Sequence, residues 1–599
     1  MANQLSIQLP TFSLLDRALA TFLSERSELH GEDKKQLQEL LLRLSNQLSA
    51  GDSCITVDSE VCALIERSGL IAIAGRDPAP LVLEEEGGNG RLYLYRYWFY
   101  ENRLAEQLKA LVNRPLENIG EPSLERYFTG EEGVGWQRKA ALCALTNSFT
   151  IITGGPGTGK TTTVVKIVAM LLEQAMIQGK PLNIALAAPT GKAAMRLQQS
   201  ITGSRELLPC DGHIREQIPV KVVTVHRLFG PRRFSPYFHH RAKNPLPYDL
   251  VIVDEASMVD LALMCKLVDA LKPHSKLILL GDKNQLASVE SGAVLADLIE
   301  ALPDKSVELK QSFRFDANIK ALSEGVNEQR AEELWQALNN GSYDNVSLLS
   351  KGDYVQDVRY AAGAGMRRSG YVQDAAGSGV RTTARTQEVE QCMKQLSRSS
   401  VARVVEQSQP YWNLIRDRAP FDKIIAAFGQ FQCLATNRVG SLGVINTNER
   451  VEGMLADRAL IERGDIGGWY QGRPIIVTQN IPELGLFNGD IGITLADPEG
   501  GLRVYFEGDE KVRDFIPSRI SHCETAWVMT IHKSQGSEFD EVLILFPEVM
   551  NPVLTKELLY TAITRAKRGV ELVVTKDIWI ASVRQKIERH SGLVKKLSQ

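Results

Sequence analysis

The feature that most constrains the fold of this 599-residue chain is a glycine-rich loop near residue 150. In "FTIITGGPGTGKTTTVVKIVAMLL", a short apolar run at residues 149–152 leads into the pattern Gly-x-x-x-x-Gly-Lys-Thr, and an apolar helical pattern follows. A strand that passes through such a loop directly into a helix is typical of parallel sheets, because parallel strands need a crossover connection. The sequence therefore predicts an α/β fold organised around this loop.

The loop has the composition of a phosphate-binding P-loop. Its glycines let backbone N–H groups turn toward phosphate oxygens at a helix N-terminus, which already favours anions. We expect Lys160 to reach the β- and γ-phosphates of a nucleoside triphosphate, and the Thr161 hydroxyl to hold Mg²⁺. The pattern indicates a nucleotide but not a reaction, because kinases, transporters, GTPases and motors share it. The predicted nucleotide-binding residues here are Gly154, Gly155, Pro156, Gly157, Thr158, Gly159, Lys160, Thr161 and Thr162.

Two further predicted strands supply groups that suit hydrolysis. The apolar run at residues 250–253 ends in Asp254 and Glu255. Asp254 is expected to hold the Mg²⁺ ion, and Glu255 to orient or deprotonate an attacking water. An acidic helix N-cap after a core strand is the alternative interpretation. The run "SKLILLGDKNQL" predicts another strand, and the loop after it presents Gln285, whose amide could sense the γ-phosphate.

Three stretches after predicted strands combine small hydroxyls, basic groups and aromatic rings: "AAPTGKAAMRL" (187–197), "VVTVHRLFG" (222–230) and "ELKQSFRF" (308–315). Hydroxyls and backbone N–H groups suit phosphodiesters, and aromatic rings suit stacked, unpaired bases. Each stretch alone is equally typical of core or surface residues, but together they predict a single-strand track beside an ATPase. The basic and aromatic loop at 231–245 fits either nucleic-acid contact or a plain exposed loop. The predicted contacts are Pro189, Thr190, Gly191, Lys192, Thr224, His226 and Phe229.

Composition excludes several other classes of protein. No run of about 18 apolar residues exists, so no membrane span is expected, and the N-terminus lacks the pattern of a signal peptide. The eight cysteines occur singly, without a Cys-x-x-Cys pair, which argues against a zinc site and a disulfide framework. The net charge of −3 neither indicates nor excludes a nucleic-acid partner. We therefore expect a cytoplasmic protein.

The order of the motifs resembles superfamily 1 DNA helicases. GGPGTGKT, APTGKAA, TVHRL, VDEAS, GDKNQL and SFRF are followed by "MTIHKSQGSEFD" (529–540) and "LLYTAITRAKR" (558–568). Within that superfamily the chain most resembles the RecD family, the alpha subunits of the bacterial RecBCD (exodeoxyribonuclease V) complex. The similarity extends to "GRLYLYRYWFYENRLAEQL" (90–108) and "RPIIVTQNIPELGLFNGDIGI" (473–493), and it is weakest at roughly 320–430.

The resemblance implies two RecA-like domains with ATP in the cleft between them. Arg565 would be an arginine finger from the second domain, and Arg314 a second cation on the same γ-phosphate; comparable fingers are worth roughly 10³–10⁵ in rate. The spacing at 558–568 reads as one amphipathic helix, with Thr561, Thr564 and Arg568 on the face of Arg565. This row of residues would then face the partner domain rather than water.

The resemblance also assigns residues outside these motifs. Gln137 matches the adenine-contacting glutamine of such motors, and Gly536 and Glu538 would lie near the nucleotide. The residues implied to contact DNA in the second domain are Thr530, His532 and Lys533.

The expected organisation has three parts. Residues 1–112 read mainly as helices, for example at 32–49, and form either a docking domain for a RecC-like partner or a plain helical cap. Motor domains are expected at 113–318 and 319–599, with a small SH3-like β-barrel insert at about 455–525, where Asn488-Gly489 is a two-residue hairpin signal. Residues 352–386, which repeat Tyr-Val-Gln-Asp, read as a surface insertion or as a DNA-contacting loop.

The resemblance implies an ATP-dependent 5′→3′ DNA helicase, part of a heterotrimer with RecB-like and RecC-like subunits in double-strand-break repair and recombination. A free-standing RecD-like helicase is the alternative, although those relatives usually carry a longer N-terminal region. A nuclease chain is disfavoured, since no separate carboxylate-plus-lysine cluster is present to hold two metals. A non-catalytic assembly module is disfavoured because the P-loop, carboxylate and arginine motifs are intact.

Overall fold

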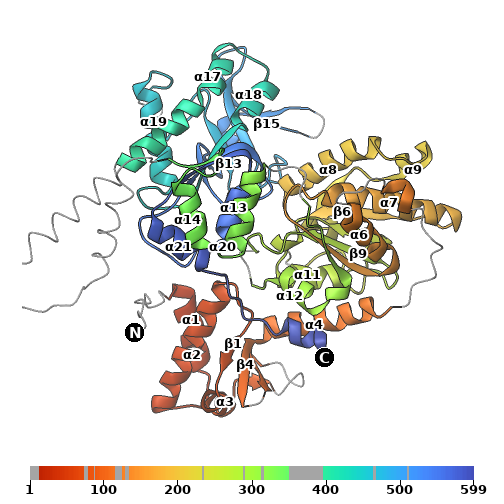
Figure 1. Ribbon diagram of the computed structural model, residues 1–599. Coiled ribbons are helices and arrows are strands. Elements are labelled where there is room, and N and C mark those ends of the chain that lie inside the picture. Colours follow the sequence, from red (N-terminus) through yellow and green to blue (C-terminus); the bar gives the residue numbers. More distant parts are fainter. Residues whose placement is uncertain are drawn as a thin grey trace, which may run out of the picture.

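The structure, a computed structural model, has three lobes (Figure 1). The N-terminal lobe lies at the bottom of the view, a lobe built on one parallel sheet lies at the right, and a lobe built on a second parallel sheet lies at the top. The predicted α/β fold with parallel sheets is confirmed. The described residues are 12–72, 79–86, 88–114, 124–128, 134–232, 235, 237–287, 291–311, 316–349, 395–462, 467–508 and 511–599. Residues 352–386 therefore lie outside them.

The N-terminal lobe contains the expected helices and also a sheet. The leucines of the predicted helix at 32–49 are buried on one face, among them Leu37 and Leu41. A four-stranded sheet of order β1-β4-β3-β2 accompanies the helices, which the mainly helical prediction missed. Its strands are short, and the acidic run at 84–86 hides the alternation typical of a half-buried strand. The elements are α1 (Leu14–Ser24), α2 (Gly31–Ser49), β1 (Ile55–Val57), α3 (Ser59–Glu66), β2 (Ile71–Ala72), β3 (Leu81–Glu86), β4 (Asn89–Leu94) and α4 (Tyr95–Val112).

The first parallel sheet has the strand order β10-β5-β9-β8-β6-β7. Every pairing in it is parallel, so the carboxyl ends of all six strands meet at one edge. The strands predicted from the sequence are confirmed. Strands and helices of this lobe are α5 (Leu124–Tyr127), α6 (Val134–Thr146), β5 (Phe149–Thr153), α7 (Lys160–Ile177), β6 (Ile184–Ala188), α8 (Gly191–Glu206), α9 (Gly212–Gln217), β7 (Val222–Thr224), α10 (Val225–Phe229), β8 (Leu250–Val253), α11 (Leu261–Asp269), β9 (Lys276–Gly281), α12 (Val294–Ala301) and β10 (Ser306–Glu308).

Helices cover both faces of this sheet because its strands are apolar on both sides. Alternate residues of β5 pack into different hydrophobic cores, because successive side chains of a strand point to opposite faces of the sheet. Phe149 and Ile151 pack with leucines of α4, α11 and α12, whereas Ile152 packs with α6, α7 and α8. The buried sheet is thereby a rigid support for the loops at its carboxyl edge.

The second parallel sheet, whose lobe we call the second lobe, has the order β11-β20-β19-β12-β18, again with parallel pairings throughout. Trp579, which is 0% exposed, lies in the core of this lobe. The elements are α13 (Ala317–Asn327), α14 (Ala331–Asn339), β11 (Val346–Leu348), α17 (Gln409–Arg416), α18 (Phe421–Phe428), β12 (Phe431–Ala435), α19 (Val444–Asp457), β18 (Val528–Thr530), β19 (Phe539–Leu545), α20 (Lys556–Ile563), β20 (Ala566–Val573) and α21 (Lys576–Arg584). The last helix, α22 (Leu593–Ser598), lies outside this lobe.

An antiparallel sheet of five strands, which we call the insert sheet, interrupts the second lobe within the range predicted for a β insert. Its own small core includes Phe506. Asn488-Gly489 does not form the predicted two-residue hairpin: Gly489 has φ +94°, but it lies in a longer connection at 478–490 that contains an Ile481–Leu486 bridge. The strands are β13 (Pro474–Val477), β14 (Ile491–Ala496), β15 (Leu502–Phe506), β16 (Arg513–Phe515) and β17 (Cys523–Thr525).

Residues 585–599, which we call the C-terminal strap, cross from the second lobe to the other two, so that α22 lies beside α4 (Figure 1). The His590 carbonyl accepts from the Ser53 N–H at 3.0 Å. Lys596 Nζ lies 3.0 Å from Oε2 of Glu101, whose side chain is 0% exposed. Leu593 joins the core beneath the first sheet. The strap therefore fixes the N-terminal lobe against the first sheet.

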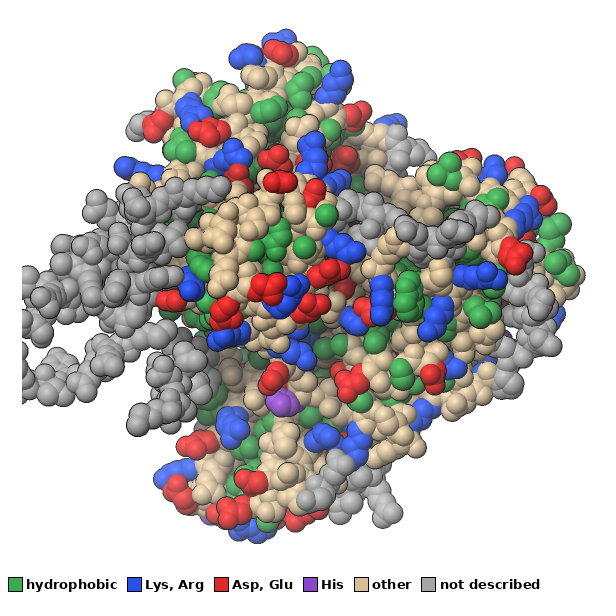
Figure 2. Space-filling model, in the orientation of Figure 1, with side chains coloured by type: hydrophobic (Ala, Val, Ile, Leu, Met, Phe, Trp, Pro, Cys, Tyr) green, Lys and Arg blue, Asp and Glu red, His purple; other side chains and the backbone are tan. Residues whose placement is uncertain are grey.

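On the face drawn in Figure 2, Lys and Arg side chains are interspersed with Asp and Glu over all three lobes. This mixture agrees with the small net charge of −3. Within the part of the chain that the structure describes, no helix has the length and apolar content to span a membrane.

Candidate functional site

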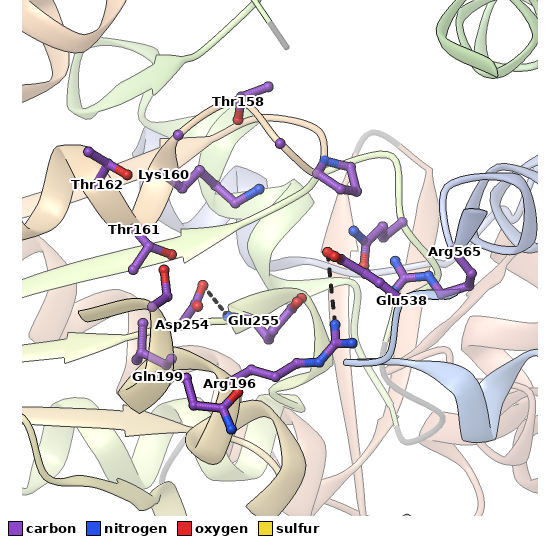
Figure 3. Close-up of a pocket in the computed structure, with 16 residues that line it drawn as sticks. Thr158, Lys160, Thr161, Thr162, Arg196, Gln199, Asp254, Glu255, Glu538 and Arg565 are labelled. Carbon is purple, nitrogen blue, oxygen red and sulfur yellow. Dashed lines mark hydrogen bonds and ion pairs between the residues drawn. The ribbon is translucent and has the colours of Figure 1, made fainter. Parts of the chain in front are cut away.

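A cavity of about 500 Å³ lies between the two parallel sheets, at the carboxyl edge of the first (Figure 3). Small-molecule sites usually measure roughly 300–1,000 Å³. The P-loop, Asp254 and Glu255 line it from the first sheet, while Glu538 and Arg565 enter from the second lobe. The lining residues are Pro156, Gly157, Thr158, Gly159, Lys160, Thr161, Thr162, Arg196, Leu197, Gln199, Ser200, Asp254, Glu255, Gln285, Glu538 and Arg565.

The P-loop connects β5 to α7 as predicted. Gly159 is the N-cap of α7 with φ +80°, a conformation that favours glycine, and a Cβ there would lie 2.8 Å from Nε2 of Gln137. The same contact brings Gln137, which is 9% exposed, to the end of the loop. Lys160 Nζ donates to the carbonyls of Gly154 and Gly155, at 2.5 and 3.0 Å. To bind a phosphate, this ammonium group must exchange carbonyls for phosphate oxygens.

The two acidic residues after β8 occupy different environments. Burial and the adjacent Glu255 raise the pKa of Asp254 to about 6, although Lys160 opposes the shift. Glu255 has φ +51°, a left-handed conformation that is uncommon for a non-glycine residue and concentrates at functional sites. A partly buried carboxylate is stabilised by a cation, and the Thr161 hydroxyl lines the same cavity. These hard oxygen donors fit a divalent metal ion that also binds phosphate.

The loop after β9 brings Gln285 to the cavity, as predicted. The Gln285 side chain is 7% exposed, and its Nε2 donates to Oδ2 of Asp282 at 3.4 Å. The amide is thereby held at the junction of the two sheets.

Arg565 reaches the cavity from the second lobe and is 3% exposed. Its Nε donates to the Thr561 carbonyl at 3.0 Å and its Nη1 to the Ser537 carbonyl at 3.2 Å. The Thr561 hydroxyl accepts from the Leu286 N–H at 2.9 Å. The prediction that Thr561 faces the other domain is therefore confirmed. The second predicted cation, Arg314, lies outside the described residues.

The prediction of one helix over 558–568 is wrong at its C-terminal half. Helix α20 ends at Ile563, Arg565 lies in the following turn, and β20 begins at Ala566. Arg568 is exposed and pairs with Asp540 at 2.6 Å instead of facing the first sheet. The strand forms because β20 pairs with both β19 and β11, and these tertiary contacts override the local helical pattern.

Gly536 and Glu538 lie where the two lobes meet. Oε1 of Glu538 is 3.8 Å from Nη1 of Arg196 on α8 (Figure 3). A Cβ on Gly536, which has φ +72°, would lie 3.8 Å from Ala193 of the same helix. Both residues thus lie beside α8, and Glu538 lines the cavity; that they lie near the nucleotide stays a prediction.

The hydroxyls predicted to contact DNA cap two helices. The Thr190 hydroxyl accepts from the Ala193 N–H and that of Thr224 from the Arg227 N–H, each at 3.2 Å. Pro189 is half-buried just before Thr190. These threonines hold the helix N-termini at the carboxyl edge of the sheet, which suits binding of a phosphodiester.

The insert sheet covers part of the same edge. A Cβ on Gly191 would lie 2.8 Å from the Phe487 ring, and the guanidinium of Arg227 lies 4.7 Å from the centre of that ring. Lys192 lines a second cavity with Asp490, and burial lowers the pKa of Lys192 to about 7. The predicted DNA-contacting residues of α8 therefore face the insert.

One predicted contact is corrected. Phe229 is 0% exposed and packs against Phe238, with ring centres 5.0 Å apart, so its ring belongs to the core beneath α10. The preceding His226 is exposed and lies 5.9 Å from the same Phe238 ring.

In the second lobe, burial lowers the pKa of His532, and Lys533 Nζ pairs with Glu524 at 2.7 Å. Thr530 ends β18 and accepts from the Lys533 N–H at 3.3 Å.

Sequence reasoning missed three residues at the junction of the lobes. The Tyr560 hydroxyl donates to Asp282 at 2.9 Å, Gln535 Nε2 donates to the Leu286 carbonyl at 3.2 Å, and Arg196 lines the cavity. A tyrosine within the otherwise apolar buried face of "LLYTAI" is the signal that could have identified Tyr560, because a buried hydroxyl needs a partner.

Two family models match parts of the chain, and solved structures are similar to it. Residues 137–291 match the family described as AAA domain, and residues 525–573 match the UvrD-like helicase C-terminal domain. A crystal structure of Pif1 helicase from Bacteroides in complex with ADP-AlF3 and ssDNA is 16% identical, with a TM-score of 0.35 over 76% of this chain and 94% of that chain.

Curated relatives match over most of the chain. RecBCD enzyme subunit RecD of Mycolicibacterium smegmatis is 38% identical over 84% of this chain and 82% of its own length. The RecD subunit of Haemophilus influenzae is 34% identical, over 85% and 80%. The ATP-dependent RecD2 DNA helicase of Deinococcus radiodurans is 28% identical over 87% of this chain and 61% of its own length. The chain therefore belongs to the RecD family of superfamily 1 helicases.

Proposed function

We propose that the chain is an ATP-dependent DNA helicase that moves 5′→3′ on DNA as a subunit of a RecBCD-type helicase–nuclease in recombination and double-strand-break repair. The observation that carries the proposal is the cavity shared by the P-loop of the first sheet and Arg565 of the second lobe. Such a site is completed only when two domains approach, so hydrolysis can be coupled to their relative movement. Identities to RecD subunits reach 38%, against 28% to RecD2, which favours a subunit over a free-standing helicase.

The residues of the cavity have complementary roles in ATP hydrolysis. Lys160 moves from the P-loop carbonyls to the β- and γ-phosphates, and Thr161 and Asp254 would hold a divalent ion, which we infer to be Mg²⁺. The ion, when bound, neutralises charge on the phosphate oxygens. Glu255 orients the attacking water and accepts its proton. As the lobes close, Nη1 of Arg565 exchanges the Ser537 carbonyl for the γ-phosphate, while its Nε keeps the Thr561 carbonyl.

The wider organisation follows from the same proposal. We propose that residues 113–318 and 319–599 form two RecA-like motor domains, which the two parallel sheets support, and that the insert is an SH3-like barrel that grips DNA. The N-terminal region, residues 1–112, docks a RecC-like partner, while nuclease activity resides on a RecB-like subunit of the heterotrimer. The exposed side chains of Leu14 (87%) and Leu15 (71%) on α1 support such a docking role, because solvent-facing leucines at the end of a lobe suit burial by a partner.

Unwinding of tailed duplexes tests the proposal. The purified full-length chain is offered duplexes with a 5′ or a 3′ single-stranded tail, with Lys160→Gln as control. We expect ATP-dependent opening of the 5′-tailed duplex alone, abolished by the substitution. DNA-stimulated ATP hydrolysis without opening of either duplex would show that unwinding needs the partner subunits. Absence of DNA-stimulated hydrolysis would contradict the motor function.

A further inference from the structure

We propose that Tyr560 is a positioning residue for ATP hydrolysis: its hydroxyl holds the loop Asp282–Leu286 of the first sheet against α20 of the second lobe, so that Gln285 and Arg565 reach the γ-phosphate together. This inference rests on the proposed ATPase function and adds a residue to it. Tyr560 itself does not line the cavity; it acts through the residues that do.

The Tyr560 hydroxyl lies where three segments meet. Its side chain projects from α20 and is 5% exposed, and the hydroxyl donates to Oδ2 of Asp282 at 2.9 Å. A Cβ on Gly155 would lie 3.0 Å from the same hydroxyl oxygen, so the phenol also touches the P-loop. One side chain of the second lobe therefore contacts both phosphate-facing loops of the first sheet.

Asp282 is the centre around which the loop after β9 turns. It is 2% exposed; its Oδ1 accepts from the Asn284 N–H at 3.0 Å, and its Oδ2 accepts from Nε2 of Gln285 at 3.4 Å. Burial raises the pKa of Asp282, whereas Lys160 and the hydroxyl of Tyr560 hold it down. Without the phenolic donor, the carboxylate would keep its place less firmly, and Gln285 would move with it.

Two further hydrogen bonds link the loop after β9 to Arg565. The next residue of α20, Thr561, accepts from the Leu286 N–H through its hydroxyl, and its carbonyl accepts from Nε of Arg565 at 3.0 Å. A displacement of the loop when the γ-phosphate leaves therefore reaches the guanidinium through adjacent residues of one helix. Packing alone would not fix the position of α20 against the loop after β9, because an apolar side chain at position 560 would lack the directional bond to Asp282.

The test compares two tyrosines that differ in their partners. Tyr560→Phe removes the hydroxyl at the junction, and Tyr411→Phe removes the hydroxyl of an equally buried tyrosine that donates to the Gly472 carbonyl at 2.8 Å, within the second lobe. For each full-length variant, the DNA-stimulated kcat, the KM for ATP and the thermal unfolding midpoint are measured. We expect Tyr560→Phe to lower kcat about 10- to 100-fold, the size of one hydrogen bond to a charged group, and to leave KM within about threefold.

A second variant tests the contact with the P-loop. Gly155→Ala places a methyl group against the Tyr560 hydroxyl, and Tyr560→Phe removes the atom that it meets. We therefore expect the double variant to lose less activity than the product of the two single losses, because residues in contact are not additive.

The outcomes separate this inference from the proposed function. Loss of hydrolysis in Lys160→Gln with a wild-type kcat in Tyr560→Phe would overturn the inference alone. Equal effects of Tyr560→Phe and Tyr411→Phe, or an effect of Tyr560→Phe on KM alone, would also overturn it. A wild-type chain without DNA-stimulated hydrolysis would remove the proposed function and the inference with it.

Discussion

The two parallel sheets have similar architecture but contribute opposite halves of one site. The first sheet presents the P-loop and two carboxylates on loops at the carboxyl ends of its strands. The second lobe contributes Arg565 from the turn after α20 and Glu538 from the position just before β19. Under the proposed function, the first sheet has the groups that bind a nucleotide, and the second lobe has the cation that completes hydrolysis. On this proposal, nucleotide binding depends on the first sheet, whereas the rate of hydrolysis depends on both Glu255 of the first sheet and Arg565 of the second lobe.

The largest effect is expected from Arg565→Ala. Because arginine fingers stabilise transition-state charge, DNA-stimulated kcat should fall about 10³-fold or more. The matched control is Arg568→Ala, whose exposed guanidinium pairs with Asp540 and lies away from the cavity. Steady-state ATPase assays compare the two. Similar losses in both variants would contradict the role of the buried arginine.

Glu255→Gln tests the first sheet's contribution to the chemical step. We expect kcat to fall about 100-fold or more, because an amide cannot accept a proton from water, while nucleotide binding persists. Asp260→Asn is the control, since Asp260 caps α11 by accepting from the Leu263 N–H at 2.8 Å. A Glu255→Gln variant with near-normal kcat would assign the base to another residue.

Lys596→Met tests whether the strap holds the lobes in place. Loss of the ammonium leaves the fully buried Glu101 without its cation, and breaking a buried pair in this way costs about 3 kcal/mol. The free energy of unfolding in denaturant should fall accordingly. Lys586→Met, at an exposed position of the same strap, should change it little. Equal stabilities of the two variants would show that the pair contributes nothing.

The smallest effect concerns pH. Burial lowers the pKa of Lys192 to about 7, with Arg196 and Arg565 adding to the shift and Asp490 and Glu507 opposing it. Lysine is charged below its pKa, so DNA affinity should weaken a few-fold as pH rises from about 6 to about 8. Lys192→Arg, which stays charged, should remove this pH dependence, as measured by equilibrium DNA binding. A wild-type affinity that is independent of pH would exclude Lys192 as a phosphate contact.

The same contrast explains what the sequence could predict. The groups on the first sheet follow buried strands directly, so local pattern alone locates Lys160, Asp254 and Gln285 at one edge. Arg565 was identified by resemblance, yet its local structure was wrong, because strand pairing by β20 ends the helical pattern at Ile563. Phe229 was misassigned since sequence shows an aromatic ring but not its burial.

Sequence patterns could not predict contacts between segments that are distant in the chain. The strap joins residues near 590 to Ser53 and Glu101, hundreds of positions earlier. The helical and strand periodicities of a sequence do not indicate such a contact. The approach of Phe487 to Gly191 is of the same kind. These contacts depend on tertiary packing, which single-sequence patterns do not encode.

Equilibrium binding of a non-hydrolysable ATP analogue to Lys160→Ala and Arg565→Ala tests the division of labour most directly. Lys160→Ala should weaken binding about tenfold or more, since it removes a charge-assisted contact to phosphate. Arg565→Ala should bind within about threefold of wild type, because a finger acts chiefly in the transition state. Weakening of binding by Arg565→Ala as large as that by Lys160→Ala would contradict the account.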